Sequence, residues 1–155
     1  MAHLAAAFNT QAPHQEIRLT GQEIIDGAVE ALPRSNYALS LTSKVCMGTA
    51  TYHLPLMNIH PEVDTCPQDL LRTILDILPD QRGVLVATGR NHHFIGTRLL
   101  TTEAWPAFLS SFLMPIILVS PRYIGHALNR GAATLRLFPC PPMKPEWPVV
   151  VAQAK

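Results

Sequence analysis

The segment from Thr88 to His93 carries three side chains that could bind a phosphate. Thr88 supplies a hydroxyl, Arg90 a fork of N–H donors and His93 an imidazole, while Gly89 lets the backbone approach an anion closely. Short apolar stretches on either side predict a hairpin with this segment at its bend. We therefore expect a phosphate-binding turn, and the alternative is a polar turn that contains one hydrogen-bonded histidine.

Asn58 and His60 form a second polar group, at the end of an expected strand. Because they alternate along that strand, both side chains project from one face, as two neighbouring ligands of one ion or phosphate must. The alternative is a polar strand end ahead of Pro61. The pair is therefore a candidate ligand set and not yet a site.

A third polar group lies on the helix expected after Pro121. Arg122, His126 and Arg130 recur every four residues, so they share one face of that helix, and Arg136 follows beyond a glycine turn. This face is either a basic surface for an anion or an ordinary solvated surface.

Histidines could also gather into a metal site, drawn from His60, His126 and either His92 or His93. No two of them have the compact helical spacing of the zinc peptidases. The sequence also lacks a nucleophile elbow, a P-loop, a paired-cysteine zinc motif and a dinucleotide fingerprint. Most familiar enzyme classes therefore have no support, and catalytic residues stay unassigned.

Taken in chain order, the three groups resemble the three motifs of the archaeo-eukaryotic primase superfamily, the primase-polymerases. The text LMNIH at 56–60 resembles the first motif, a strand that ends in two alternating acids. TGRNHHF at 88–94 matches the second, in which Ser or Thr, Gly and Arg lead to a histidine in a hairpin. VSPRYI at 119–124, with the residues up to Arg136, resembles the third, where relatives have an acid at the position of Ser120. The resemblance covers about residues 37–152.

The resemblance implies a metal site at the first and third motifs. Family acids there hold the divalent ions, Mg²⁺ or Mn²⁺ with a nucleotide, that two-metal phosphoryl transfer requires. Asn58, His60 and Ser120 stand at these positions here, so up to three negative charges that Mg²⁺ prefers are missing. Glu62 and Asp64 follow in an expected loop. A degenerate metal site beside a retained phosphate-binding turn is therefore expected.

The resemblance thus implies a module that binds a nucleotide or a nucleic-acid end through Thr88, Arg90 and His93, with Arg136 in support, and that lacks ordinary polymerase activity. Such a module would serve replication, repair or a mobile element. One alternative is an active nucleotidyltransferase that uses a softer ion such as Mn²⁺ or Zn²⁺, which an imidazole at His60 tolerates better. Another is a non-catalytic subunit whose apolar stretch at 112–119 docks a protein partner or a second copy.

Periodicity and turn residues predict the elements that position these groups. Helices are expected at 20–33, 65–79, 101–113 and 121–131. Strands are expected at 37–47, 52–59, 83–87, 93–97, 134–138 and 149–152. The predicted core consists of their inward apolar residues: Leu70, Leu71, Ile74, Leu75, Val84, Val86, Trp105, Phe108, Leu109, Phe112, Leu135 and Leu137. This order predicts an α+β fold, a mostly antiparallel sheet with helices packed on its faces.

The composition describes one globular domain. With 155 residues, of which 48% are hydrophobic and 15% charged, the chain can bury a core without disulfides or metals. Residues 1–15 show no period and predict a loose arm before a single domain at 16–155. Three widely spaced cysteines, no signal peptide and no apolar run of membrane length favour the cytoplasm and exclude a membrane partner.

Charge is distributed unevenly along the chain. Residues 1–82 hold five basic and nine acidic side chains, and residues 83–155 hold seven and two, so the formal charges are −4 and +5. A basic C-terminal half suits an anionic ligand, with scattered solvated charges as the alternative.

Overall fold

The computed structural model describes residues 17–29, 31, 39–61, 65–114, 118–139 and 145–154. Its chain divides into two compact units, residues 1–35 and 36–155. The expected arm at 1–15 lies outside the described residues, and the extent of a single domain from residue 16 onward stays a prediction.

α2 (Gly21–Ile25) is the helix of the first unit, and it begins where the sequence predicts. The Thr20 hydroxyl accepts from the Glu23 N–H, and the Glu23 carboxylate accepts from the Thr20 N–H at 2.7 Å, a bond that lowers the pKa of Glu23. The helix is shorter than expected because Gly27 has a φ of 85° and the Ala28 N–H donates back to the Glu23 carbonyl. No residue of α2 is buried, so the predicted apolar stripe does not form there.

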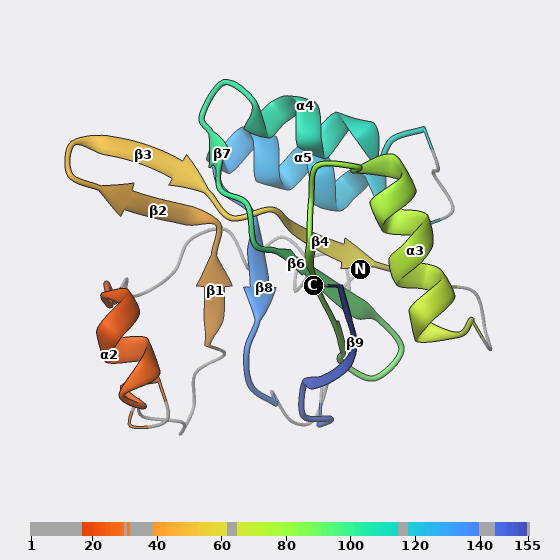
Figure 1. Ribbon diagram of the computed structural model, residues 1–155, viewed down its shortest axis with the longest axis horizontal. Coiled ribbons are helices and arrows are strands. Elements are labelled where there is room, and N and C mark those ends of the chain that lie inside the picture. Colours follow the sequence, from red (N-terminus) through yellow and green to blue (C-terminus); the bar gives the residue numbers. More distant parts are fainter. Residues whose placement is uncertain are drawn as a thin grey trace, which may run out of the picture. The chain divides into compact units, whose positions relative to one another are not determined.

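The strands of the second unit form three antiparallel sheets (Figure 1). The first pairs β1 (Ser40–Thr42) with β8 (Thr134–Arg136). The second has the order β2 (Lys44–Met47), β3 (Ala50–His53), β7 (Leu100–Thr101), and the third has the order β4 (Leu56–Ile59), β6 (His92–Gly96), β5 (Gly83–Ala87), β9 (Val149–Ala154). The predicted α+β fold with antiparallel pairing is confirmed, although the strands divide among three sheets.

Two of the expected strands are each split in two. Ser43 separates β1 from β2, and Pro55 lies between β3 and β4. Pro55 has no N–H to donate to a ladder, and the Ser43 hydroxyl accepts from the Ala133 N–H at 3.0 Å, so at both places the chain passes from one sheet to another. The predicted hairpin remains between β2 and β3, where Gly48 has a φ of 62°.

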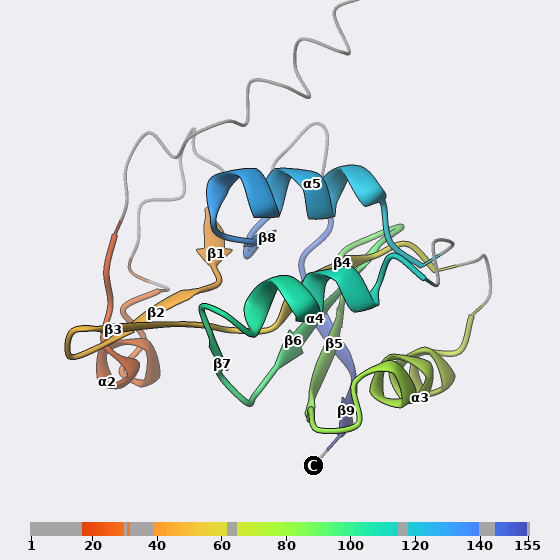
Figure 2. The same ribbon diagram turned by 90° about the horizontal axis from the view of Figure 1, so that it is seen from above.

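Three helices accompany these sheets: α3 (Pro67–Ile77), α4 (Trp105–Ser111) and α5 (Pro121–Arg130). α3 packs against β9 and β5, and the strands of the four-stranded sheet lie between α3 and α5 (Figure 2). α4 begins later than expected, because Thr101 belongs to β7 and its hydroxyl accepts from the Ala104 N–H. α5 ends where the sequence predicts, at Gly131, which is a left-handed C-cap with a φ of 64°. Among the described residues, no helix has both the length and the apolar character to cross a membrane.

One cluster of buried apolar side chains holds the second unit together. Its fully buried members come from strands and helices alike: Leu56, Met57, Ile59, Ile74, Leu85, Phe94, Leu109 and Phe112. Most of the predicted core is buried, whereas Leu75, Val84 and Leu137 are half-buried. Because burying a large apolar side chain contributes about 1.5–3 kcal/mol, this cluster sets the relative positions of the strands that carry the site.

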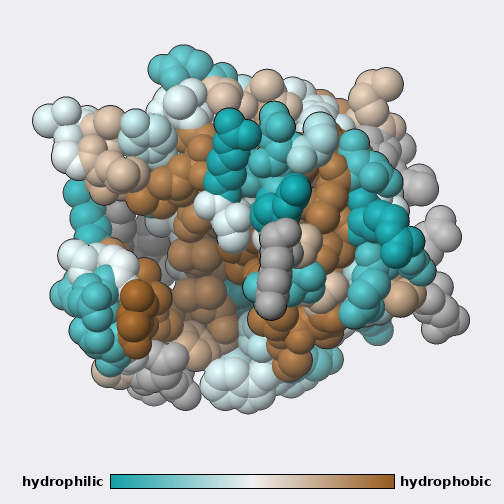
Figure 3. All heavy atoms as spheres, in the orientation of Figure 1, coloured by the Kyte–Doolittle hydropathy of each residue, from teal (hydrophilic) through white to brown (hydrophobic). Residues whose placement is uncertain are grey.

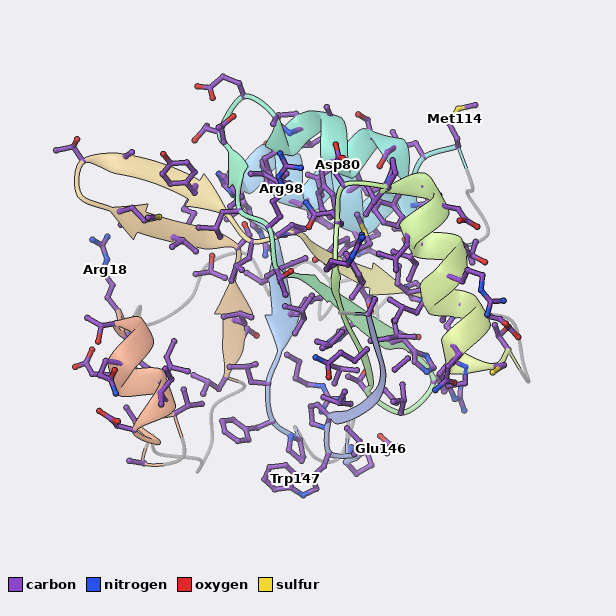
Figure 4. All side chains as sticks on the ribbon, viewed as in Figure 1. Arg18, Asp80, Arg98, Met114, Glu146 and Trp147 are labelled. Atoms are coloured by element: carbon purple, nitrogen blue, oxygen red, sulfur yellow. The ribbon has the colours of Figure 1, made fainter. Side chains whose placement is uncertain are left out.

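The apolar stretch 112–119 starts and ends inside this cluster. Phe112 and Val119 are buried, whereas Leu113 is 41% exposed. Met114 projects outward and is 89% exposed (Figure 4). Residues 115–117 lie outside the described residues, so a docking role of this stretch stays a prediction.

Protonation of His53 should destabilise the second unit. His53 is buried and stacked on Trp105 with ring centroids 4.3 Å apart, and its Nδ1 lies 3.0 Å from the Ser43 hydroxyl. Burial, with a smaller contribution from Lys44, lowers the pKa of His53 below 6.5. The neutral ring is therefore favoured in the folded state. The neutral His53 ring contributes fully to the free energy of unfolding above about pH 6.5. As the pH decreases from there, that free energy should fall by at most about 1.4 kcal/mol per pH unit.

Urea unfolding between pH 8 and pH 5 measures this dependence. Burial also lowers the pKa of His92, so that residue acts in the same direction. The pKa values of Glu23 and Glu103 are lowered from 4.5, so these two groups change the free energy of unfolding only below pH 5. The His53→Asn variant should show a weaker pH dependence than the parent, and a parent stability that is constant from pH 8 to pH 5 would contradict the assignment.

Candidate nucleotide site

The candidate site lies at one end of the four-stranded sheet. In the β4–β6 ladder, Asn58 is opposite His93 and Ile59 is opposite His92. The β5–β6 turn, residues 88–91, follows at the same end, because Ala87 is also paired with His92. The first and second polar groups of the sequence are therefore neighbours in space, although about 30 residues separate them in the chain.

The segment before α5 reaches the opposite edge of β4. Ile59 forms an antiparallel bridge with Val119, and just beyond β4 the His60 N–H donates to the Leu118 carbonyl at 2.7 Å. Continuing this register places Ser120, the half-buried residue that precedes α5, opposite Asn58. Residues directly opposite in antiparallel strands have Cβ atoms about 4.5–5.5 Å apart, so Ser120 and His93 flank Asn58 on its two sides.

Asn58 and His60 lie on one face of the strand, as their alternation predicts. The Asn58 Nδ2 and the His60 Nε2 are 3.2 Å apart. The Asn58 Oδ1 is buried and has no hydrogen-bond partner among the described residues, whereas His60 is exposed. An amide and an imidazole are therefore in contact at this end of the strand.

This donor set does not fit a pair of hard divalent ions. Asn58, His60 and Ser120 supply an amide, an imidazole and a hydroxyl, whereas Mg²⁺ prefers anionic oxygens. Within the described ranges, no group of three or more His, Cys, Asp or Glu side chains comes close enough to hold a metal ion, and this includes the histidine combination considered above. Glu62 and Asp64 lie outside the described residues.

The turn between β5 and β6 is closed by Thr88. Its N–H and its hydroxyl both donate to the Asn91 carbonyl, at 2.8 and 3.0 Å, and the residue is only 3% exposed. Gly89 has a φ of 89°, a left-handed conformation that favours glycine. Thr88 therefore shapes the turn from inside and does not present its hydroxyl to solvent.

Arg90 and His93 differ sharply in exposure. Arg90 is exposed at the tip of the turn, and its guanidinium forms no hydrogen bond or ion pair with any other residue that the structure describes. His93 is 7% exposed, beside Asn58. Arg90 is therefore open to an anion in solution, whereas His93 is largely shielded from solvent.

Arg136 holds the loops around the turn together. Its Nη1 donates to the carbonyls of Phe138 and Glu146, each at 2.9 Å, and its Nη2 donates to the Thr88 carbonyl at 3.1 Å. These bonds use three of the five N–H donors of the guanidinium. Its expected support of a phosphate is therefore indirect, through the position of the turn.

Glu146 belongs to this site, and the sequence reasoning did not include it. A Cβ placed on Gly89 would lie 3.0 Å from the Glu146 carboxylate, so the glycine leaves room for that carboxylate against the turn. Figure 4 shows Glu146 beside Trp147 in the loop before β9. The sequence did single out this residue by composition, because Glu103 and Glu146 are the only acidic residues after residue 82.

Replacing Glu146 by glutamine should strengthen phosphate binding at the turn. The carboxylate occupies the backbone face that an anion would approach, and two like charges about 4 Å apart in water repel by about 1 kcal/mol. We expect the Kd for inorganic phosphate to fall roughly fivefold at low salt, measured by calorimetry. Glu103→Gln is the matched control and should leave the Kd unchanged. A loss of Mg²⁺-dependent nucleotide binding in Glu146→Gln would instead make this carboxylate a cation ligand.

The third polar group remains on α5. Arg122 is exposed, and His126 and Arg130 are half-buried on the face that their spacing predicts. Each of the three takes part in an interaction within the chain. Only Ser120, at the start of this helix, is brought to Asn58 by the strand register.

Comparison with known protein families gives a match over most of the chain. The family model AEP-like, described as archaeo-eukaryotic primase 1D-like, matches residues 19–148, which is well over half of the chain. No curated protein and no solved structure matches the chain. The matched span contains the end of β4, the β5–β6 turn and the start of α5. The chain therefore belongs to the AEP-like family of archaeo-eukaryotic primase domains.

Proposed function

We propose that this primase domain binds the phosphates of a nucleotide or of a nucleic-acid end at the β5–β6 turn. The observation that carries the proposal is the pair of Arg90, exposed at the tip of the turn, and His93, buried at its base beside Asn58. A guanidinium and an imidazole can each donate to phosphate oxygens. The family membership supports a nucleic-acid partner in replication, repair or a mobile element, and the cytoplasm remains the predicted compartment.

The proposed module lacks ordinary Mg²⁺-dependent polymerase activity. Two-metal phosphoryl transfer needs anionic ligands for both ions, and among the described residues no group of three or more His, Cys, Asp or Glu side chains comes together to supply them. The roles left to this chain are to bind and orient. Thr88 and Arg136 hold the turn, Arg90 and His93 bind the phosphates, and Asn58 with Ser120 lies beside them.

A second candidate function is nucleotidyl transfer with a softer ion. The buried Asn58 Oδ1 has no partner within the described part of the chain, and the imidazole of His60 lies next to the same amide. An amide oxygen with an imidazole suits Mn²⁺ or Zn²⁺ better than Mg²⁺.

Thermal melting with nucleoside triphosphates separates the two functions. A ligand that binds only the folded protein stabilises it, by about 2.7 kcal/mol at a ligand concentration of 100 Kd. The ligand therefore raises Tm. The binding module predicts the same rise with and without metal, whereas the soft-ion enzyme predicts a rise that needs Mn²⁺ or Zn²⁺. No rise under any condition would remove both.

A further inference from the structure

Trp147 exposes a large aromatic surface beside the candidate site. It is 55% exposed, whereas the other tryptophan, Trp105, is 3% exposed in the core. Trp147 directly follows Glu146, the residue whose carboxylate lies against Gly89. In Figure 4 the indole projects from the loop before β9, away from the body of the sheet.

This indole is held in place from two sides. Its ring meets Phe138 edge to face, with centroids 5.7 Å apart and planes at 89°. The Arg136 guanidinium bonds the Glu146 carbonyl just before it and also the Thr88 carbonyl in the turn. Pro148 then restricts the backbone on the other side. The position of Trp147 relative to the β5–β6 turn is therefore set by the fold.

We propose that Trp147 stacks against an unpaired base of a nucleic-acid strand whose phosphates lie at the β5–β6 turn. An indole held in place stacks on any base without reading its sequence, and a neighbouring cation binds the backbone of the same strand. Arg90 is that cation, one residue from the Gly89–Glu146 contact that joins the turn to Trp147. The proposal rests on the proposed function and assigns the contact with a base of the strand to Trp147.

A protein partner is the other occupant that this surface must be tested against. Val149 and Val150, which follow in β9, are 57% and 59% exposed, and β9 is an edge strand. Figure 3 shows hydrophobic side chains gathered over this part of the molecule. The nucleobase is favoured because Arg90, exposed in the turn that Glu146 joins to Trp147, supplies a cation for the backbone of the same strand.

Two oligonucleotides of equal length separate base stacking from phosphate binding. One is a ten-nucleotide oligothymidylate, and the other is the same backbone without bases. Trp147→Ala should weaken binding of the oligothymidylate roughly five- to hundredfold, the range for losing one stacked base, and should leave the abasic strand unchanged. Trp147→Phe should retain most of the affinity. Val150→Ala, at an exposed apolar residue of the neighbouring strand β9, is the control.

Fluorescence supplies a readout that a structural role of Trp147 would not change. The oligothymidylate should quench tryptophan emission in the parent protein, because only Trp147 is accessible, and should not do so in Trp147→Phe. Thymidine monophosphate is the second ligand in this measurement. Quenching by the monophosphate as strong as that by the oligothymidylate would mean that the stacked base comes from a free nucleotide and not from a strand. Tm measurements identify any variant that fails to fold, in which case the quenching in the parent protein decides.

The outcomes divide cleanly. Equal weakening of both oligonucleotides by Trp147→Ala, or no quenching on binding, would overturn the stacking proposal while leaving the phosphate site intact. Unchanged binding of the abasic strand by Arg90→Ala would instead remove the phosphate site. Concentration-dependent dimerisation that Trp147→Ala abolishes, without binding of either strand, would assign the surface to a second copy of the chain.

Discussion

Replacing Arg90 by alanine should weaken binding of a nucleoside triphosphate by about tenfold or more. Arg90 is exposed at the tip of the β5–β6 turn, and nothing in the described chain engages its guanidinium, so its donors are available to a phosphate. A hydrogen bond to a charged group contributes about 1.5–3 kcal/mol, which corresponds to roughly ten- to hundredfold in Kd. Isothermal titration at low salt measures the change directly.

Arg98→Ala is the matched control for this variant. Arg98 is also an exposed arginine of the basic half, but it follows the far end of β6 and lies 3.8 Å from Asp80 in an ion pair (Figure 4). Its loss should leave nucleotide affinity unchanged. His93→Ala should weaken binding as Arg90→Ala does, with a Tm measurement beside it because His93 is buried. Equal affinities for all three variants would remove the proposed site.

Converting Asn58, His60 and Ser120 together to aspartate should create Mg²⁺ binding that we do not expect of the parent. The strand register places these positions side by side, so three carboxylates would converge there. Without metal they should repel one another and lower Tm. With Mg²⁺ at about 100 Kd, binding should restore about 2.7 kcal/mol, or roughly 5–10 °C in Tm.

The triple alanine variant at the same positions controls for lost packing. It should show no Mg²⁺-dependent change in Tm. A triple aspartate variant that is likewise insensitive to Mg²⁺ would mean that the three side chains do not share an ion. Primer extension by the parent chain in Mg²⁺ would contradict the degenerate metal site, while the family assignment would stand.

Local signals in the sequence predicted most elements of the site. The Thr88–Asn91 turn, the strand that ends at Ile59 and the Gly131 cap were all recognisable from neighbouring residues. These features depend on interactions within a few residues, such as a left-handed glycine or a period of two. The order of the three polar groups also resembled primase motifs, and the family match over residues 19–148 confirms that resemblance.

Helix and strand lengths were less predictable. The helix expected at 20–33 ends at Ile25, and two expected strands are split at Ser43 and Pro55. The apolar pattern of the sequence continues across the end of α2 and across both strand breaks. The breaks follow from backbone conformation at Gly27 and from the long-range bond of Ser43 to Ala133, which periodicity does not express.

By itself, the sequence determined the α+β class, the primase motifs and the residue types available to a phosphate. Tertiary structure alone decided which of them meet: Ser120 comes beside Asn58 through the Val119–Ile59 bridge. It also turned Thr88 inward, committed Arg136 to three carbonyls and brought Glu146 to the turn. The physical reason is that strand register and loop closure depend on contacts between residues far apart in the chain, which local residue patterns do not encode.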